Sequence, residues 1–125
     1  MNIRTTALLT VLFFAMLTAC HKPNEEPTST YPKQVTIVYR VSSSTADSLV
    51  SITYDNETGG QSTAENPHLP FSKSISKTVN KYDIITLGFF VNPAKSVKLE
   101  IIVNNQVVKA QDYSVPNAAM SYTFP

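Results

Sequence analysis

The chain contains a single cysteine, Cys20, which is the residue best suited to chemistry. A thiol reacts as its thiolate, which is a strong nucleophile and can accept a transferred group. Two small residues, Thr18 and Ala19, precede it, and the polar, proline-rich residues 21–32 follow. Because there is no second cysteine, we expect no disulfide within the chain.

The residues before Cys20 are arranged like a secretory leader. Arg4 gives a positive start, and residues 6–17 are mostly apolar. This run is too short to cross a bilayer comfortably, since that takes about 20 apolar residues. A buried core helix is the alternative, but it would need an amphipathic stripe or caps. We therefore predict that residues 1–19 are a signal peptide.

The four residues Leu17, Thr18, Ala19 and Cys20 resemble the lipoprotein box of bacteria, L-[AST]-[AG]-C. In that family the cysteine sulfur carries acyl chains of the palmitate type, and the leader is cut before the cysteine. The resemblance implies lipidation of Cys20 and anchoring to a membrane. Each CH2 group of an acyl chain that is buried in the membrane contributes about 0.8 kcal/mol to membrane binding, and a single acyl chain holds a protein only marginally. An ordinary cleaved leader with a chance cysteine is the alternative.

Residues 20–33 are predicted to be a lipidated tether, because they are polar, contain three prolines and show no periodicity. His21 follows the cysteine, where an aspartate would resemble an inner-membrane retention signal of enterobacteria. Its absence favours the outer membrane, on either the periplasmic or the surface face.

Few other residues could support catalysis or metal binding. His68 is the only histidine beyond the tether, so a Ser-His-Asp site or a zinc site would depend on one loop residue. Asp55, Asn56, Glu57 and Glu65 offer oxygen ligands for calcium, but their spacing matches no EF-hand loop. A solvated turn is the simpler interpretation. We predict no enzyme activity, no cofactor and no metal.

The rest of the chain alternates apolar and polar residues, as strands do. Val35, Ile37, Tyr39 and Val41, for example, alternate with Thr36, Val38 and Arg40. No segment keeps a helical period. We therefore predict an all-β domain at 34–125, a seven-stranded antiparallel immunoglobulin-like β-sandwich, with a small closed barrel as the alternative. The predicted strands are 35–41, 50–54, 71–79, 83–91, 97–103, 106–115 and 119–124.

Two connections attract attention. Asn104-Asn105 lies between two alternating runs and predicts a type I′ hairpin turn, because asparagine tolerates positive φ. Residues 56–70 form the longest stretch without a strand pattern. Such a loop is either a plain connection or a partner-binding loop. The candidate partner-loop residues are Asp55, Asn56, Glu57, Glu65 and His68.

The tyrosines divide into two groups. Tyr39, Tyr54 and Tyr122 fall on apolar faces and are predicted to lie in the core. Tyr82 and Tyr113 are predicted to be exposed, where they could stack on a sugar.

The charge of the chain argues against nucleic acid as a partner. There are 10 lysines and arginines against 9 aspartates and glutamates, and Arg4 falls in the leader. No basic face is indicated.

Three phrases occur in a familiar order: "SITYDNETGG" (51–60), "LPFSKSI" (69–75) and "VKLEIIVNNQVVK" (97–109). Together they resemble the C-terminal domain of the MmpS family of mycobacterial membrane proteins. The resemblance implies an immunoglobulin-like sandwich and an accessory role beside MmpL-type exporters of lipids and siderophores. The chain departs from the family in carrying a lipoprotein box instead of a membrane helix, and in lacking a cysteine pair.

We therefore predict a membrane-anchored lipoprotein that acts as a non-catalytic binding or transport-accessory module at the cell envelope. It would hold the membrane through the lipid on Cys20 and an envelope protein or glycan through its domain. A glycan- or surface-binding lipoprotein is the alternative. A long uncovered edge strand would favour the first function, and exposed aromatics clustered on one face the second. A cleft with convergent polar groups would favour an enzyme.

Overall fold

The computed structural model describes residues 30–125, whose regular structure consists of eight strands. The signal peptide, the lipoprotein box, Cys20 and the tether up to residue 29 lie outside the described residues. The strands are β1 (Lys33–Ser42), β2 (Ser51–Asp55), β3 (Gln61–Glu65), β4 (Phe71–Val79), β5 (Ile84–Phe90), β6 (Val97–Val103), β7 (Gln106–Tyr113) and β8 (Asn117–Thr123).

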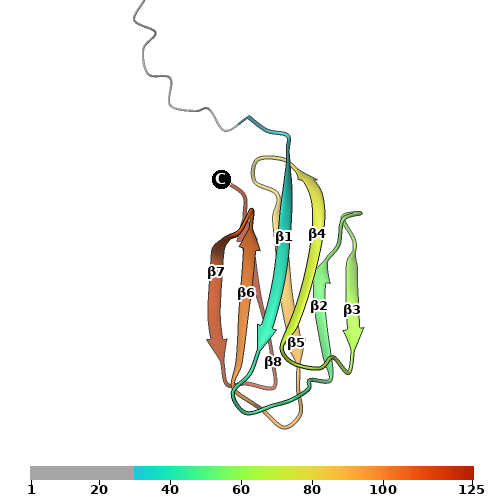
Figure 1. Cartoon of the computed structure of the whole chain (residues 1–125), viewed down its shortest axis with the longest axis vertical. Coiled ribbons are helices and arrows are strands. Elements are labelled where there is room, and N and C mark those ends of the chain that lie inside the picture. The colour runs from blue at the N-terminus through green and yellow to red at the C-terminus, as the bar shows by residue number, and fades with distance from the viewer. Residues whose placement is uncertain (1–29) are drawn as a thin grey trace, which may run out of the picture.

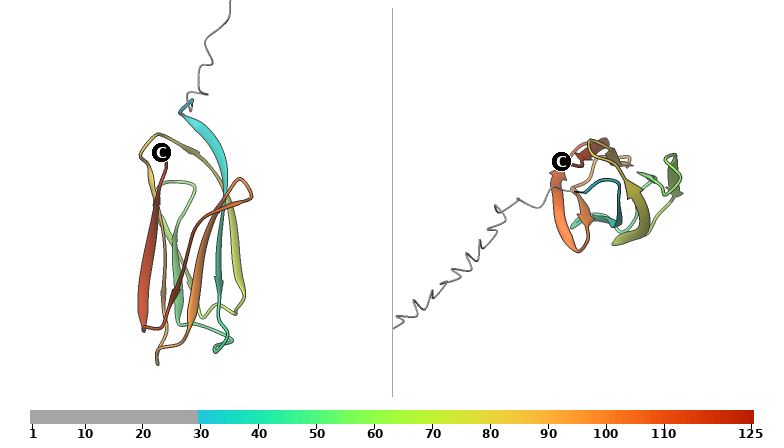
Figure 2. Two further views of the ribbon diagram at one scale, coloured as in Figure 1. Left: turned by 90° about the vertical axis from the view of Figure 1, so that its left-hand side faces the viewer. Right: turned by 90° about the horizontal axis from the view of Figure 1, so that it is seen from above.

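Two four-stranded sheets pack face to face (Figure 1, Figure 2). One has the order β4-β1-β6-β7 and the other β3-β2-β5-β8, and every pair of neighbours is antiparallel. The prediction of an all-β antiparallel sandwich is confirmed. Because the two sheets remain separate, the closed barrel is wrong.

The strand that sequence reasoning missed is β3, which lies inside the predicted loop 56–70. Its sequence, "QSTAE", has no large apolar residue, and only Ser62 and Ala64 are half-buried. An edge strand that covers little of the core needs no strong apolar alternation. The stretch 56–70 is therefore a hairpin arm followed by a connection, and not one long loop.

The core lies between the sheets and consists of alternate side chains from both. β1 contributes Val35, Ile37, Tyr39 and Val41, all at most 2% exposed. Full burial of such a side chain stabilises the fold by about 1.5–3 kcal/mol. Further buried residues come from every strand except β3 and β7, and they include Ile52, Ile75, Ile85, Leu87, Phe89, Val97, Leu99, Ile101, Met120 and Phe124.

Tyr39 brings a hydroxyl group into this core, and that group has a hydrogen-bond partner. Its O–H donates to the backbone carbonyl of Asp55 at 2.8 Å. Burial, and then the negative charge of Asp55, raise the pKa of the Tyr39 hydroxyl well above its usual range. The ring lies 5.4 Å from that of Tyr54, centroid to centroid.

The predicted environments of the tyrosines hold with one exception. Tyr39 and Tyr54 are buried, Tyr122 is partly buried against the core, and Tyr82 is 68% exposed. Tyr113 was expected to be exposed but is half-buried, with its ring 5.9 Å from that of Phe89. The cause is the position of β7, which brings Tyr113 over the end of the second sheet.

The Asn104-Asn105 turn joins β6 and β7 as predicted. Both residues have positive φ, 48° and 66°, as a type I′ turn requires. The Asn104 N–H donates to the Thr36 carbonyl at 2.9 Å, and its side-chain oxygen accepts from the Thr36 N–H at 3.0 Å. Asn104 therefore extends the ladder between β1 and β6 by one residue pair.

The chain enters the sandwich at the end where its last residues lie (Figure 1). Since the strands alternate in direction, the β2–β3, β4–β5 and β6–β7 turns share this end. The described residues, 30–125, contain no helix that could cross a membrane.

Candidate functional site: the free strand edges

The predicted partner-loop residues do not form one site. Asp55 is the last residue of β2. Its carboxylate supplies the hydrogen-bond acceptor that no backbone carbonyl of β2 provides for the neighbouring strand β5 at this point. Oδ2 accepts from the Thr86 N–H at 2.9 Å, and Oδ1 accepts from the Gln61 side-chain amide at 3.2 Å. Both oxygens therefore serve the fold.

Asn56 organises the turn between β2 and β3. Its Oδ1 accepts from the N–H groups of Thr58 and Gly60, at 3.0 and 3.1 Å. Its Nδ2 donates to Ser62 Oγ at 3.1 Å, and Gly59 takes a φ of 87° that favours glycine. The turn is fixed from within, and Glu57 projects from it exposed.

Glu65 is the last residue of β3, at the end away from the β2–β3 turn, and His68 follows it in the connection to β4. Glu65 is opposite Ser51, and His68 forms a bridge with Ser48. The structure brings Asp55, Asn56 and Glu57 together and separates them from Glu65 and His68. Within residues 30–125, no group of three or more His, Cys, Asp or Glu residues could hold a metal ion.

On one side of the sandwich, the edge strands β7 and β8 are linked by side chains of β7. Lys109 Nζ donates to the Ser121 carbonyl of β8 at 2.8 Å, and the Tyr113 hydroxyl makes a longer bond of 3.5 Å to the Ala119 carbonyl. Both carbonyls lie on the edge of β8, pointing away from β5. Two carbonyls of the free β8 edge thus accept hydrogen bonds from side chains of β7, across the two sheets.

The opposite side carries β4 and β3, one edge strand from each sheet (Figure 1, Figure 2). The hydrogen bond between Asn104 and Thr36 shows that the backbone N–H and C=O groups of Thr36, and of every second residue after it in β1, point toward β6. The intervening residues of β1 therefore face β4, and they bond to Phe71, Lys73, Ile75, Lys77 and Val79. The N–H and C=O groups of the other β4 residues point away from the sheet. These outward residues are Ser72, Ser74, Ser76 and Thr78.

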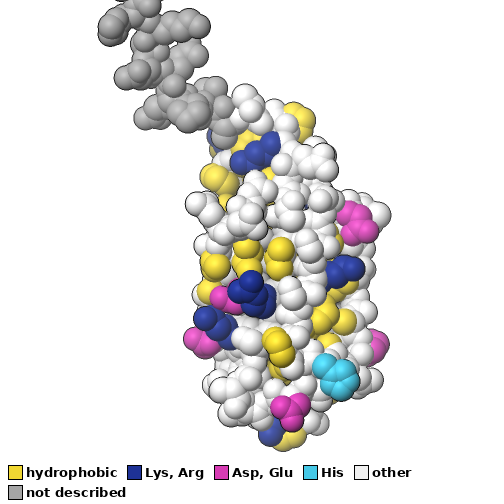
Figure 3. All heavy atoms as spheres, in the orientation of Figure 1, with side chains coloured by type: hydrophobic (Ala, Val, Ile, Leu, Met, Phe, Trp, Pro, Cys, Tyr) yellow, Lys and Arg dark blue, Asp and Glu magenta, His cyan; other side chains and the backbone are white. Residues whose placement is uncertain are grey.

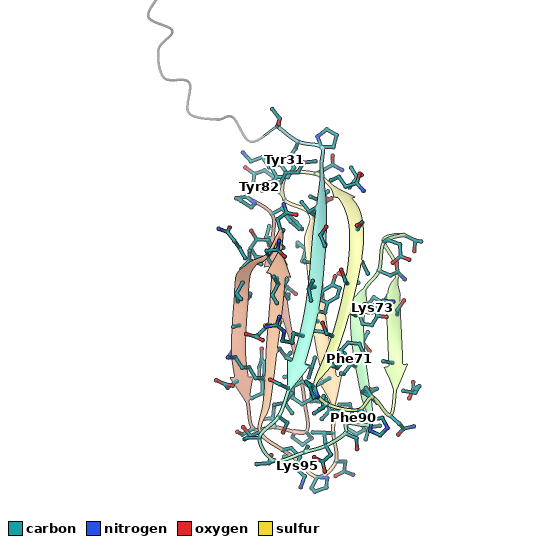
Figure 4. All side chains as sticks on the ribbon, in the orientation of Figure 1. Tyr31, Phe71, Lys73, Tyr82, Phe90 and Lys95 are labelled. Carbon is teal, nitrogen blue, oxygen red and sulfur yellow. The ribbon has the colours of Figure 1, made fainter. Side chains whose placement is uncertain are left out.

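The side chains of β4 separate by the same alternation. Ser72, Ser74, Ser76 and Thr78 are exposed on the outer face of the sheet. Phe71, Lys73, Ile75, Lys77 and Val79 share the face of the core, because their partners in β1 are core residues. Figure 4 shows Phe71 and Lys73 beside each other on this strand. We call the outward backbone groups together with this core-side row the β4 edge.

β3 offers a shorter free edge. The Asn56 N–H donates to the Gly60 carbonyl at 2.9 Å and the Asn66 N–H to the Val50 carbonyl at 2.9 Å. The alternation between these bonds leaves Gln61, Thr63 and Glu65 with backbone groups pointing outward. β4 is nine residues long and β3 is five, so β4 is the longer template on this side.

Two shallow depressions lie elsewhere on the surface. One, of about 410 Å³, lies over Gly88 on the outer face of the second sheet, and Phe90 borders it. The other, of about 310 Å³, is lined by Ser42, Ser43, Ser44, Ser96, Lys98 and Asp112. In the latter, the Ser43 hydroxyl donates to the Ser96 carbonyl and Lys98 lies 3.7 Å from Glu100. These groups are engaged in the fold.

Among residues 30–125, the exposed aromatic rings do not gather on one face. Tyr82 and Phe90, 68% and 40% exposed, lie at opposite ends of the domain (Figure 4). On the face in Figure 3, the apolar side chains lie in several separate groups among polar ones. On the reasoning from the sequence, three features would distinguish a partner-binding module, a glycan-binding lipoprotein and an enzyme. Of these three, the described residues show the long uncovered edge strand, which favours a partner-binding module.

Sequence reasoning identified the "FSKSISKTV" strand but not that it is an edge. The available signal was the position of Lys73 and Lys77, which fall on the apolar side of the alternation. Lysines that point inward are a device of edge strands, because a buried central strand could not solvate them.

The chain was also compared with known proteins. No model of a protein family matches it, and no curated protein is significantly similar to it. The resemblance to the MmpS family therefore stays a prediction that depends on the three phrases of sequence.

Proposed function

We propose that the chain is a membrane-anchored lipoprotein whose β-sandwich is a non-catalytic binding module at the cell envelope. Its partner would add an extended strand to β4. The observation that supports this most directly is the row of outward N–H and C=O groups at Ser72, Ser74, Ser76 and Thr78. An unpaired edge of this kind is a template for another strand.

The energetics favour a specific partner over indiscriminate binding. Four outward residues offer an N–H and a C=O each. At about 0.5–1.5 kcal/mol net for each hydrogen bond, full pairing contributes about 4–12 kcal/mol. Association costs about 4–15 kcal/mol in lost freedom. Backbone pairing alone therefore gives weak binding, and the side chains of the partner decide whether the complex is stable.

The proposed anchor suits this role. Lipid on Cys20 would hold the protein to the membrane, and a tether of about a dozen residues reaches roughly 20 Å as a coil. A small domain on such a tether can search for a neighbour in the same membrane. The resemblance to the MmpS family makes an exporter component one candidate for that neighbour.

The test is a photo-reactive amino acid at Ser74 in the full lipoprotein, irradiated in native envelopes. Ser74 is exposed and its backbone points outward, so a bound strand would lie within reach. Asp112, exposed on β7, which is the edge strand at the other end of the same sheet, is the matched control position. We expect a defined cross-linked protein from position 74 and none from 112. Absence of any cross-linked protein at 74 would contradict the proposal.

A glycan-binding lipoprotein is the second candidate, and the depression beside Phe90 favours it. The ring of Phe90 is 40% exposed, next to polar side chains of Ser51, Thr53 and Asn117. A sugar could stack on the ring and bond to the polar rim. Envelope polysaccharide should then be retained by the wild type and lost with Phe90→Ala, while Tyr82→Ala has no effect.

A further inference from the structure

We infer that the β4 edge selects an acidic strand: an extended segment with two carboxylates four residues apart and an apolar residue midway between them. This inference rests on the proposed function, since it names the chemistry of the partner that β4 accepts. It is supported by the two lysines on the core side of β4.

Lys73 lies opposite Tyr39, and Lys77 lies opposite Val35. Directly opposed residues in an antiparallel ladder share a face, so both lysines project toward the space beside the core. They are four residues apart, which is about 13 Å along a strand. Lys73 is exposed and Lys77 half-buried.

Neither lysine has a carboxylate partner within the described part of the chain. The ion pairs among residues 30–125 join Arg40 to Glu100 and Lys98 to Glu100, at 3.4 and 3.7 Å. All three of these residues lie on the outer face of the same sheet. The β4 edge thus presents two positive charges that its own domain leaves without a counter-charge.

The residue between the two lysines is apolar. Ile75 is 6% exposed and packs in the core, and half-buried Phe71 continues the same row. A strand that bonds to Ser72, Ser74, Ser76 and Thr78 would place alternate side chains beside this row. The matching pattern is acid, any residue, apolar, any residue, acid.

A second copy of the chain fits this edge poorly. Antiparallel pairing of two β4 strands through all four outward residues puts 72 opposite 78 and 74 opposite 76. Lys73 of each copy would then face Lys77 of the other, twice over. Like charges directly opposite destabilise a strand pair. The lysines therefore repel self-association while attracting an acidic strand, which is how specificity is often achieved.

The test uses the full lipoprotein in detergent micelles and three synthetic peptides. The acidic peptide, VTETVTETV, puts valine and glutamate on one face in the order that complements β4, and it reads the same in both directions. The basic peptide, VTKTVTKTV, replaces both glutamates with lysine, and VTQTVTQTV removes the charge. Affinity is measured by fluorescence anisotropy at low and high salt.

The wild type should bind the acidic peptide at least about tenfold more tightly than the basic one, with a preference that weakens in high salt. The double variant Lys73→Glu, Lys77→Glu should invert the preference. The control Lys81→Glu, Lys95→Glu makes the same charge change in the β4–β5 and β5–β6 connections, outside the row of the β4 edge, and should keep the wild-type order. Circular dichroism verifies folding, and Lys73→Gln with Lys77→Gln provides a milder second variant that should abolish the preference.

Several results would overturn the inference. These are equal affinity for acidic and basic peptides, an unchanged preference in the double variant, or a wild-type dimer formed through β4 in sedimentation. The proposed function is judged separately by cross-linking at Ser74. If a defined partner is captured there but charge reversal has no effect on its capture, the function stands and the acidic-strand inference is wrong.

Discussion

Proline substitutions at adjacent residues of β4 test whether the backbone directions assigned to this edge are correct. Ser74 and Lys73 are both exposed, so replacing either removes little buried side-chain area. They differ in where the N–H points. The N–H of Ser74 points away from the sheet, whereas that of Lys73 bonds to β1 opposite Tyr39. Proline has no N–H, and its ring occupies that space.

The two costs can be estimated from this geometry. Lys73→Pro removes a ladder hydrogen bond, leaves a buried carbonyl of β1 unpaired and places the proline ring against that carbonyl. We expect these effects to lower the free energy of unfolding by about 3 kcal/mol or more. Ser74→Pro removes no ladder hydrogen bond. A proline also forces the residue before it into an extended conformation, and Lys73 already has that conformation in β4. We therefore expect Ser74→Pro to lower the free energy of unfolding by about 1 kcal/mol or less. For a domain of this size, 1 kcal/mol shifts Tm by about 4–8 °C.

The assay is thermal unfolding of the lipoprotein in detergent, followed by circular dichroism, alongside cross-linking in envelopes from a photo-reactive residue at Ser76. Lys73→Pro should lower Tm by about 12 °C or more, and Ser74→Pro by about 8 °C or less. Ser74→Pro should nevertheless reduce partner capture, because the ring blocks an added strand. Equal Tm losses, or a larger loss for Ser74→Pro, would refute the assigned directions.

Three further predictions concern other parts of the chain. Cys20→Ser should release the protein from membranes or leave it uncleaved; detergent partitioning and intact mass would show this, and an unmodified mature wild type would contradict lipidation. Asn105→Gly should leave Tm unchanged or raise it, whereas Asn105→Val should cost about 1 kcal/mol or more, because a β-branched residue resists the φ of 66° there. Gly88→Val should cost about 1–3 kcal/mol in a urea titration, since a Cβ at that position meets the Ala119 Cβ at 3.1 Å. Gly60→Ala, whose nearest contact would be 3.7 Å away, is the control, and equal losses at the two glycines would exclude crowding as the cause.

The sequence predicts those strands that bury a full row of large apolar residues. β1 and β6 are examples, because each has Val, Ile, Leu or Tyr at successive alternate positions and mostly polar residues between them. β3 escaped because its inward positions carry only Ser62 and Ala64. Alternation of apolar and polar residues in the sequence reflects the burial of side chains. A strand that is held mainly by backbone hydrogen bonds to one neighbour therefore shows little alternation.

The candidate site was harder to predict because an edge is a property of strand order. Nothing local to "FSKSISKTV" says that β4 pairs with β1 and with no other strand. Order depends on contacts between distant parts of the chain, such as β1 with β6. The inward lysines were visible, but their meaning depends on whether a neighbour covers them. Similarly, Asp55 and Asn56 drew attention as polar loop residues, while their hydrogen bonds give them structural roles.

The bond between Lys109 and the Ser121 carbonyl has a consequence for aggregation. β8 is seven residues long, lacks charge and proline, and lies at the edge of its sheet, which are the traits of segments that seed fibrils. Fibril growth needs edge carbonyls that can accept the N–H groups of an incoming copy. Lys109 occupies one of them and places a charge beside it, so a copy adding to β8 would have to displace and desolvate an ammonium group. Through this one side chain, β7 protects the edge of β8 from pairing with another copy. Many copies can therefore be crowded on one surface with less aggregation.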